Sequence, residues 1–264
     1  MPPSFERELE VAERAARAAG EIIAGHYAKG PIAVETKADE SPVTIADKQA
    51  SAAIAEILRA EFPGDAILDE EQPDDAARLA AERVWIVDPL DGTRDFVART
   101  GQFSVHVALA VAGEAVVGVM YQPVAQALFA ARQGGGAWRN GERIHVSDRR
   151  SDLRIGVSRM VVNPRLARFL ADAGLDRHVV PMGASTRHGA IAAGELDATI
   201  ILSGDFQWDT AAPEVVIREA GGMLTDGDGL PFRYNLREVA HPRGSIVSNG
   251  ACHAQLVELL QRHL

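Results

Sequence analysis

WIVDPLDGTRDF, residues 85–96, begins as a strand and ends in a tight acidic turn. The apolar run Val84–Val87 predicts a buried strand. Pro89 cannot donate a hydrogen bond to a sheet, so the strand is expected to end at Asp88. The next three residues bring Asp91 back beside Asp88. The stretch therefore predicts two carboxylates held close together where a buried strand ends.

These two carboxylates would repel each other if both were ionised with no cation between them. The candidate ligands nearby are all oxygens, with no Cys or His, and such a set favours a hard ion, Mg²⁺ before Zn²⁺. Gly92 permits whatever φ the turn requires, and Thr93 is a suitable N-cap for a short helix. The alternative interpretation is a polar turn that carries two solvated aspartates.

Two further acidic segments stand where strands or helices are expected to end or begin. Glu70 and Glu71 follow a short strand predicted at Ala66–Leu68. Asp209 precedes Thr210 at an apparent helix start in FQWDTAAPEV. Taken alone, each segment is more often a helix cap or a solvated acid than a ligand. Together with the first turn, they indicate convergence on one metal site.

The first part of the chain has the order of an α+β protein, with helices followed by antiparallel strands up to about Val146. In KADESPVTIADKQA, Thr44 and Asp47 match a capping box with Asp in the place of Glu, which predicts a structural role for Asp47. The predicted elements are helices over residues 5–27 and 44–63, strands at 66–68 and 84–87, a hairpin of 103–112 with 115–121, and a strand at 127–132.

From Leu153 the pattern changes to shorter alternating strands and helices. The predicted strands are residues 154–159, 178–183, 198–203 and a last one at 245–248, and the predicted helices are residues 163–174, 185–196 and 210–222. The charged, loop-like stretch Ser147–Ser151 separates the two patterns. We therefore expect an N-terminal α+β subdomain, residues 1–148, that carries most metal ligands, and a C-terminal α/β subdomain, residues 149–264, that supplies Asp209 and substrate contacts.

The composition excludes several classes of protein. A formal charge of -10 over 264 residues argues against a nucleic-acid or anionic-membrane surface, either of which needs a basic patch. Cys252 is the single cysteine, so neither an intrachain disulfide nor a thiolate metal cluster is expected. The start of the chain has no signal-peptide pattern and no run reaches the length of a membrane span. These features favour a cytoplasmic protein.

Four segments, in their order and spacing, resemble the inositol monophosphatase superfamily: DESPVTIAD, DEE, WIVDPLDGTRDF and WDTAAPEVVIREAGG. The resemblance extends from about Ala12 to Ser248. It implies a layered α-β-α-β-α sandwich, usually a homodimer, and a Mg²⁺-dependent, lithium-sensitive phosphomonoesterase that acts on a small phosphorylated metabolite with two or three Mg²⁺ ions. The alternative of another class is a catalytically silent sensor or scaffold that binds a phosphate ligand. No expected ligand has been lost, and this favours the enzyme.

The resemblance also assigns roles to residues of this chain. The metal ligands that it implies are Glu70, Asp88, the backbone carbonyl of Leu90, Asp91 and Asp209. Thr93 pairs with Asp47 to orient and deprotonate a water, and Glu70 is grouped with them as catalytic. The backbone N–H groups of Gly92 and Thr93 are expected to hold the phosphate. The substrate contacts that it implies are Glu70, Leu90, Asp91, Gly92, Thr93, Arg187 and Asp209.

Within the superfamily, the chain looks most similar to the 3'(2'),5'-bisphosphate nucleotidases, in KADESPVT, DGTRDF, WDTAAP and PFRYN. Inositol monophosphatases usually have a Glu where Leu202 stands, so the acceptor for a sugar hydroxyl is missing, unless Asp205 replaces it. Three arginines are candidates to hold a second phosphate: Arg94, Arg187 and Arg233. We expect hydrolysis of the 3'-phosphate of adenosine 3',5'-bisphosphate, with inositol 1-phosphate and histidinol phosphate as alternatives.

One residue departs from the family pattern. Asp69 precedes the acidic pair where the family usually has a small Gly or Ser. An additional carboxylate here would either tune metal affinity or face water. The second interpretation is favoured from the sequence.

Overall fold

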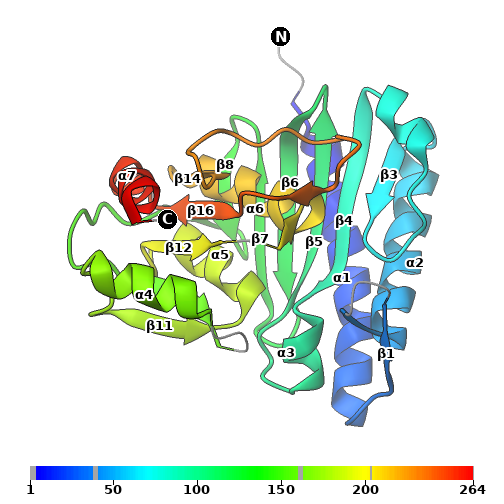
Figure 1. The fold of residues 1–264 in the computed structure, drawn as a ribbon. Coiled ribbons are helices and arrows are strands. Elements are labelled where there is room, and N and C mark those ends of the chain that lie inside the picture. Colours follow the sequence, from blue (N-terminus) through cyan, green and yellow to red (C-terminus); the bar gives the residue numbers. More distant parts are fainter. Residues whose placement is uncertain (1–3, 38–40, 160–162, 203, 264) are drawn as a thin grey trace.

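A computed structural model describes residues 4–37, 41–159, 163–202 and 204–263. Within them, layers of helices and sheets alternate in the order helices, sheet, helices, sheet, helices (Figure 1). No helix in these ranges combines the length and the apolar composition that crossing a membrane requires. The α+β class and the layered α-β-α-β-α sandwich predicted from the sequence are confirmed.

The first layer consists of α1 (Glu6–Lys29) and α2 (Ile45–Glu61), which cover one face of the larger sheet. The buried stripe of α1 is mostly alanine, which lets the helix approach the sheet closely. At Gly20, an added Cβ would lie 2.4 Å from the Tyr121 ring, so only glycine fits there. Both helices were predicted from their apolar spacing, and α2 begins with the expected capping box at Thr44.

The larger sheet has seven strands in the order β3-β4-β5-β6-β7-β8-β9, in which only β3 and β4 are paired in parallel. The strands are β3 (Ala66–Asp69), β4 (Arg83–Asp91), β5 (Ser104–Val111), β6 (Glu114–Gln122), β7 (Ala127–Arg132), β8 (Gly136–Arg139) and β9 (Glu142–Ile144). The short connections are η1 (Ala76–Ala80) after β3 and α3 (Thr93–Val97) after β4. The last two strands, β8 and β9, were not predicted, because their glycine-rich sequence has no alternating pattern.

Strand β4 continues three residues beyond its predicted end at Asp88, so that prediction was wrong. The pairing with β5 shifts between Asp88, opposite His106, and Asp91, opposite Ser104. Pro89 falls inside this bulge, where its missing N–H interrupts no ladder bond. The bulge is what allows the strand to carry both aspartates at one end.

The third layer, α5 (Ala184–Ala192) and α6 (Gln207–Glu219), lies between the two sheets. The second sheet has the order β11-β10-β12-β16-β14. Its strands are β10 (Ile155–Ser158), β11 (Val179–Met182), β12 (Ala198–Ile201), β14 (Met223–Asp226) and β16 (Ser245–Ser248). The outer helices α4 (Pro164–Asp172) and α7 (His253–His263) complete the fold. Two short pairs, β1 (Val34–Thr36) with β2 (Pro42–Thr44) and β13 (Asp205–Phe206) with β15 (Ala240–His241), lie outside both sheets.

In the second half, the predicted strands and helices up to α6 correspond to β10, α4, β11, α5, β12 and α6, and residues 245–248 form β16. Ser203, the last residue of the strand predicted at 198–203, lies outside the described residues. Strand β14 and helix α7 were not predicted. The segment after β9 joins the two sheets, and the division into subdomains 1–148 and 149–264 stays a prediction.

Candidate metal centre and active site

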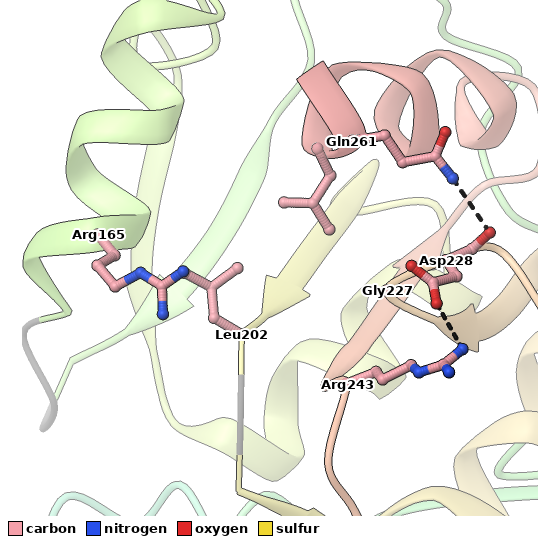
Figure 2. Close-up of a pocket in the computed structure, with 7 residues that line it drawn as sticks. Arg165, Leu202, Gly227, Asp228, Arg243 and Gln261 are labelled. Carbon is pink, nitrogen blue, oxygen red and sulfur yellow. Dashed lines mark hydrogen bonds and ion pairs between the residues drawn. The ribbon is translucent and has the colours of Figure 1, made fainter. Parts of the chain in front are cut away.

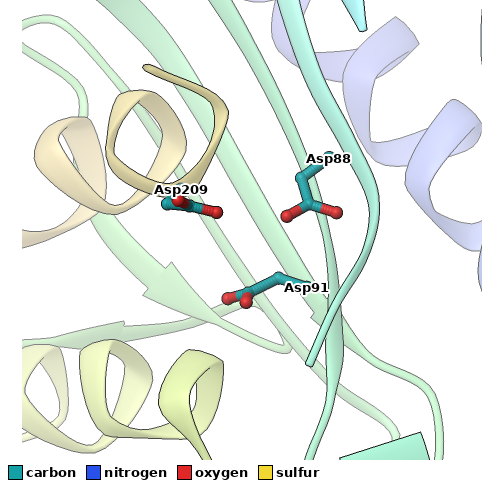
Figure 3. Close-up of side chains that lie close together, drawn as sticks. All are labelled: Asp88, Asp91 and Asp209. Carbon is teal, nitrogen blue, oxygen red and sulfur yellow. The ribbon is translucent and has the colours of Figure 1, made fainter. Parts of the chain in front are cut away.

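Three buried or half-buried aspartates meet between the two sheets (Figure 3). Asp88 and Asp91 stand on the bulged end of β4, and Asp209 lies in the first turn of α6. One carboxylate oxygen from each lies within 4.8 Å of the others. The structure thus brings together three of the acids singled out in the sequence, although 118 positions separate Asp91 from Asp209 (209 minus 91).

Two of these carboxylates are oriented by their own backbone. The Leu90 N–H donates to Asp88 Oδ1 at 2.9 Å, and the Phe206 N–H donates to Asp209 Oδ2 at 2.7 Å. Each bond fixes the orientation of the carboxylate relative to its own turn. The turn after β4 and the start of α6 therefore both fold in a way that presents an oxygen ligand.

The electrostatics of the cluster favour a bound cation. Burial, together with neighbouring carboxylates, raises the pKa of Asp91 to about 7 and raises the pKa values of Asp88 and Asp209 well above their ordinary range. Three such groups cannot all be ionised cheaply at neutral pH unless a positive charge lies among them. The donor set consists of oxygens alone, which fits a hard divalent cation such as Mg²⁺.

Glu70 lies beside Asp88, and its own carboxylate is held by a lysine. Lys37 Nζ donates to Glu70 Oε1 at 2.7 Å and to Glu71 Oε1 at 2.6 Å. Burial alone would lower the pKa of Lys37, but the two glutamates raise it above its ordinary value, so the ammonium stays charged. Sequence reasoning missed Lys37, because no spacing rule links a residue just after β1 to the turn after β3.

Asp47 and Thr93 are in contact. Thr93 Oγ1 lies 3.0 Å from Asp47 Oδ1 and 3.2 Å from the Leu90 carbonyl oxygen. Asp47 Oδ2 accepts from the Thr44 N–H at 2.8 Å and from Thr44 Oγ1 at 2.6 Å, so the predicted capping box is confirmed. Burial raises the pKa of Asp47, and these hydrogen bonds oppose the rise. One aspartate therefore both begins α2 and reaches the candidate site.

Thr93 is the first residue of α3 and not its N-cap, which corrects the prediction by one position. The N-cap is Gly92, whose φ of 97° lies in the left-handed region that favours glycine. The Thr93 hydroxyl is directed to Asp47 and Leu90, so it is not free to cap the helix. That the N–H groups of Gly92 and Thr93 hold a phosphate stays a prediction.

Asp69 does not face water, so the interpretation favoured from the sequence was wrong. Its side chain is buried and accepts hydrogen bonds from Ser51 Oγ at 2.9 Å and from the Glu71 N–H at 2.8 Å. Burial raises the pKa of the Asp69 carboxyl. Asp69 therefore ties the turn that carries Glu70 and Glu71 to α2.

The three candidate arginines differ in position. Arg187 on α5 is only 4% exposed, and its charge acts on Asp205 and Asp91. Its Nη1 donates to Thr199 Oγ1 at 2.9 Å, and burial lowers the pKa of its guanidinium. Arg94 is exposed on α3, one residue after Thr93.

Arg233 is not close to the metal centre. It forms a 2.6 Å ion pair with Glu114 at the turn between β5 and β6. Strand β5 pairs with Asp91 at Ser104 and with Glu114 at Val111. Seven steps of ~3.3 Å separate these two ends by about 23 Å. The suggestion that Arg233 holds a second phosphate in this site is therefore wrong.

The two residues considered for a sugar hydroxyl lie in different surroundings. Asp205 is buried and accepts a hydrogen bond from Ser245 Oγ, and burial raises its pKa to about 6. Leu202 lines a surface hollow of about 350 Å³ near the end of β12 (Figure 2). The other lining residues are Arg165, Gly227, Asp228, Arg243, Leu260 and Gln261. Arg243 is already paired with Asp228 there.

His106 is a neighbour of the site that the sequence did not assign to it. The ring is fully buried, with Nε2 2.9 Å from Ser104 Oγ and 3.6 Å from Asp91 Oδ2. Burial lowers the pKa of His106 to about 4, so the ring is neutral at pH 7. It therefore does not supply the positive charge that the aspartates need.

Most of the chain is similar to known proteins. The model of the inositol monophosphatase family matches residues 5–264. The 3'(2'),5'-bisphosphate nucleotidase CysQ of Escherichia coli strain K12 is 35% identical over 229 residues, which cover 84% of this chain and 92% of the relative. The Nus factor SuhB of Pasteurella multocida is 33% identical and covers 84% of this chain and 85% of the relative.

Solved structures agree with this similarity. The crystal structure of CysQ from Bacteroides thetaiotaomicron, described as a bacterial member of the inositol monophosphatase family, has a TM-score of 0.81 and 31% identity. The match covers 94% of this chain and 98% of the other. Since the family model, the relatives and the fold agree, this chain belongs to the inositol monophosphatase family and is a phosphatase that acts on a phosphate ester.

Proposed function

We propose that the protein is a Mg²⁺-dependent phosphomonoesterase that hydrolyses the 3'-phosphate of adenosine 3',5'-bisphosphate, with water as the nucleophile. The observation that carries the metal part is the convergence of Asp88, Asp91 and Asp209 on one point, in contact range of one ion. The residues that would hold two or three ions are Glu70, Asp88, the Leu90 carbonyl, Asp91 and Asp209. Bound Mg²⁺ would offset the phosphate charge and make water more acidic.

The proton path follows from the contact between Thr93 and Asp47. Because the Thr93 hydroxyl donates to Asp47 Oδ1, a lone pair on Thr93 Oγ1 is left to accept a hydrogen bond from the attacking water. As the water attacks, its proton would pass to Thr93 while the Thr93 proton passes to Asp47. The Thr44 hydrogen bonds to Asp47 Oδ2 keep the other oxygen aimed at Thr93.

Three observations support the bisphosphate nucleotide as substrate. Relatives named 3'(2'),5'-bisphosphate nucleotidase share 34–36% identity with the chain. Arg187 places a buried positive charge near Asp91, where a second phosphate would find a partner. Leu202 cannot accept a hydrogen bond from a ring hydroxyl. Inositol 1-phosphate is the second candidate, because solved inositol monophosphatases share the fold at 29% identity.

Phosphate release from a panel of esters with Mg²⁺ tests the proposal. The specificity constant should be at least about tenfold higher for adenosine 3',5'-bisphosphate than for 3'-AMP, since one charge-assisted contact to the second phosphate contributes ~1.5–3 kcal/mol. Replacing Arg187 by Gln should reduce that preference more than it reduces activity on 3'-AMP. Equal specificity constants for inositol 1-phosphate and the bisphosphate would refute the proposed substrate. If no ester released phosphate, the catalytically silent phosphate-binding protein would be the better interpretation.

The compartment and the assembly form part of the same proposal. Cys252 is a free, buried thiol, which suits the reducing cytoplasm. The homodimer expected from the family resemblance stays a prediction, and sedimentation of the purified protein would test it.

A further inference from the structure

A segment without regular structure, residues 230–239, connects β14 to β15 by way of the first sheet. We call it the strap. In Figure 1 it is the orange chain that leaves β14, crosses toward β4 and β5, and returns to β16. The Tyr234 N–H donates to the Gly113 carbonyl at 3.0 Å, which anchors the strap on the first sheet. The strap therefore contacts both halves of the molecule.

On one side, the strap is hydrogen-bonded to η1, the short helix that follows the turn of Glu70 and Glu71. Asn235 Nδ2 donates to the carbonyls of Arg78 at 2.8 Å and Ala81 at 3.2 Å. In return, Arg78 Nη1 donates to Asn235 Oδ1 at 2.9 Å and to the Leu236 carbonyl at 3.1 Å. Arg78 is only 2% exposed and also forms a two-pronged ion pair with Asp74. The segment from Glu70 to Ala81 is therefore held at its C-terminal end by hydrogen bonds with the strap.

On the other side, the strap is bonded to the start of α6. Gln207 is fully buried, and its Nε2 donates to the carbonyls of Leu236 at 3.2 Å and Glu238 at 3.0 Å. Its Oε1 accepts from the Leu236 N–H at 3.3 Å. The Gln207 N–H donates to the Val239 carbonyl at 2.9 Å. Gln207 precedes Asp209 by two residues, so these bonds fix the helix turn that presents this aspartate.

We propose that Asn235 and Gln207 are positioning residues for the metal centre, because they set the distance between the turn that carries Glu70 and the helix start that carries Asp209. The inference rests on the proposed metal site. Glu70 and Asp209 come from segments that approach each other from different layers of the fold. Leu236 receives both Arg78 and Gln207 on its carbonyl, so a shift of either segment is passed to the other through one residue. Groups that hydrogen-bond a metal ligand govern metal affinity, and Asn235 and Gln207 would act one step further out, through the segments that carry the ligands.

The backbone of Asn235 determines which variant is informative. Its φ of 57° lies in the left-handed region, where most side chains are strained. Asn235→Gly keeps this conformation accessible while it removes the three hydrogen bonds that the side chain forms with Arg78 and Ala81. Gln207→Met is the second variant, since it preserves volume and removes the polar contacts. Arg233→Ala is the matched control on the same strap, because its ion pair with Glu114 is exposed and distant from the metal centre.

Binding of Mn²⁺, followed by electron paramagnetic resonance well below each melting temperature, tests the inference without turnover. We expect Asn235→Gly and Gln207→Met each to weaken Mn²⁺ binding by roughly tenfold, the lower end of the range for groups that hydrogen-bond a metal ligand directly, and Arg233→Ala to leave it unchanged. Phosphatase activity of the two variants should recover as Mg²⁺ is raised, which a merely structural defect would not do.

The opposing results are distinct. Wild-type affinity in folded Asn235→Gly and Gln207→Met would overturn the positioning role while the proposed function stood. An equal loss in Arg233→Ala would also overturn it, because general loosening of the strap would then explain the effect. Failure of the wild-type protein to bind Mn²⁺ would remove the metal site itself, and the inference with it.

Discussion

Replacing Thr93 by Val separates the two roles that the contact with Asp47 can have. Valine preserves the shape and the branched Cβ but removes the hydroxyl, so Asp47 Oδ1 loses its 3.0 Å partner while Asp47 Oδ2 keeps both bonds from Thr44. A hydrogen bond to a charged group contributes ~1.5–3 kcal/mol, and for a chain of this size that lowers the melting temperature by roughly 3–10 °C. Folding at 25 °C would remain nearly complete.

The catalytic consequence should be much larger. General acid–base catalysis contributes typically ~10²–10⁴-fold, and the Thr93 hydroxyl is the group in contact with Asp47 that would relay the proton. We therefore expect the kcat of Thr93→Val to fall by that factor at saturating Mg²⁺. Mn²⁺ affinity should change little, because Thr93 is not part of the carboxylate cluster.

Thr93→Ser is the control, since serine retains the hydroxyl at the same place and should keep most of the activity. Phosphate release and thermal unfolding are measured on the same preparations of the three proteins. A Thr93→Val enzyme with kcat within about threefold of wild type, combined with the lower melting temperature, would mean that the contact only stabilises the start of α2 and α3.

Three further variants test other parts of the site and fold. Asp91→Asn should nearly abolish phosphate release at saturating Mg²⁺ and leave the circular dichroism spectrum intact, because it removes a ligand charge and keeps the shape; normal turnover would refute the metal assignment. Asp69→Ala should lower the free energy of unfolding in urea by ~1–3 kcal/mol, as the Glu71 N–H and Ser51 lose their acceptor; an unchanged midpoint would contradict this. Burial would raise the pKa of Asp197, but hydrogen bonds from Arg154 and Ser147 hold it below its ordinary value. This contribution to stability is present above about pH 4 and lost as pH falls through the folded pKa, so Asp197→Asn should flatten the acid side of the stability curve, measured by urea unfolding at several pH values.

Features that depend on neighbouring positions in the chain were predictable from the sequence. The capping box at Thr44 and the buried run before Asp88 each lie within a few residues, and both are confirmed. Helix α7 could also have been predicted, because His253, Leu256 and Leu260 follow helical spacing and are buried.

Features that depend on contacts between distant loops were not predictable. Lys37 reaches Glu70 across 33 positions, and Ser51 reaches Asp69 across 18. Arg78 and Asn235 are 157 positions apart. Neither strand nor helix periodicity relates such residues, because each contact depends on where the layers place two segments that are distant in the sequence. The prediction that Asp69 faces water failed for this reason, because its partner Ser51 lies on α2, whose position is set by the fold.

Four aspartates around the site share one local hydrogen-bond pattern, in which the carboxylate accepts from a nearby backbone N–H. At the ends of β3 and β4, Asp69 and Asp88 each accept the N–H of the residue two positions ahead. At the starts of α2 and α6, Asp47 and Asp209 each accept the N–H of the residue three positions back. A short carboxylate reaches its own backbone in this way, whereas the longer side chain of Glu holds its oxygens less directly.

This shared hydrogen-bond pattern explains how acids that repel each other keep their positions in the folded chain. A hydrogen bond from a backbone N–H stabilises the charged form of each aspartate and fixes one oxygen, so the turn itself keeps the carboxylate oriented before any cation is bound. One oxygen each of Asp88, Asp91 and Asp209 then lies within 4.8 Å of the others, and neither Asp88 nor Asp209 has a protein cation as hydrogen-bond partner among the described contacts. Local turns thus orient the ligands, and long-range contacts such as those of the strap bring the oriented ligands within reach of one ion.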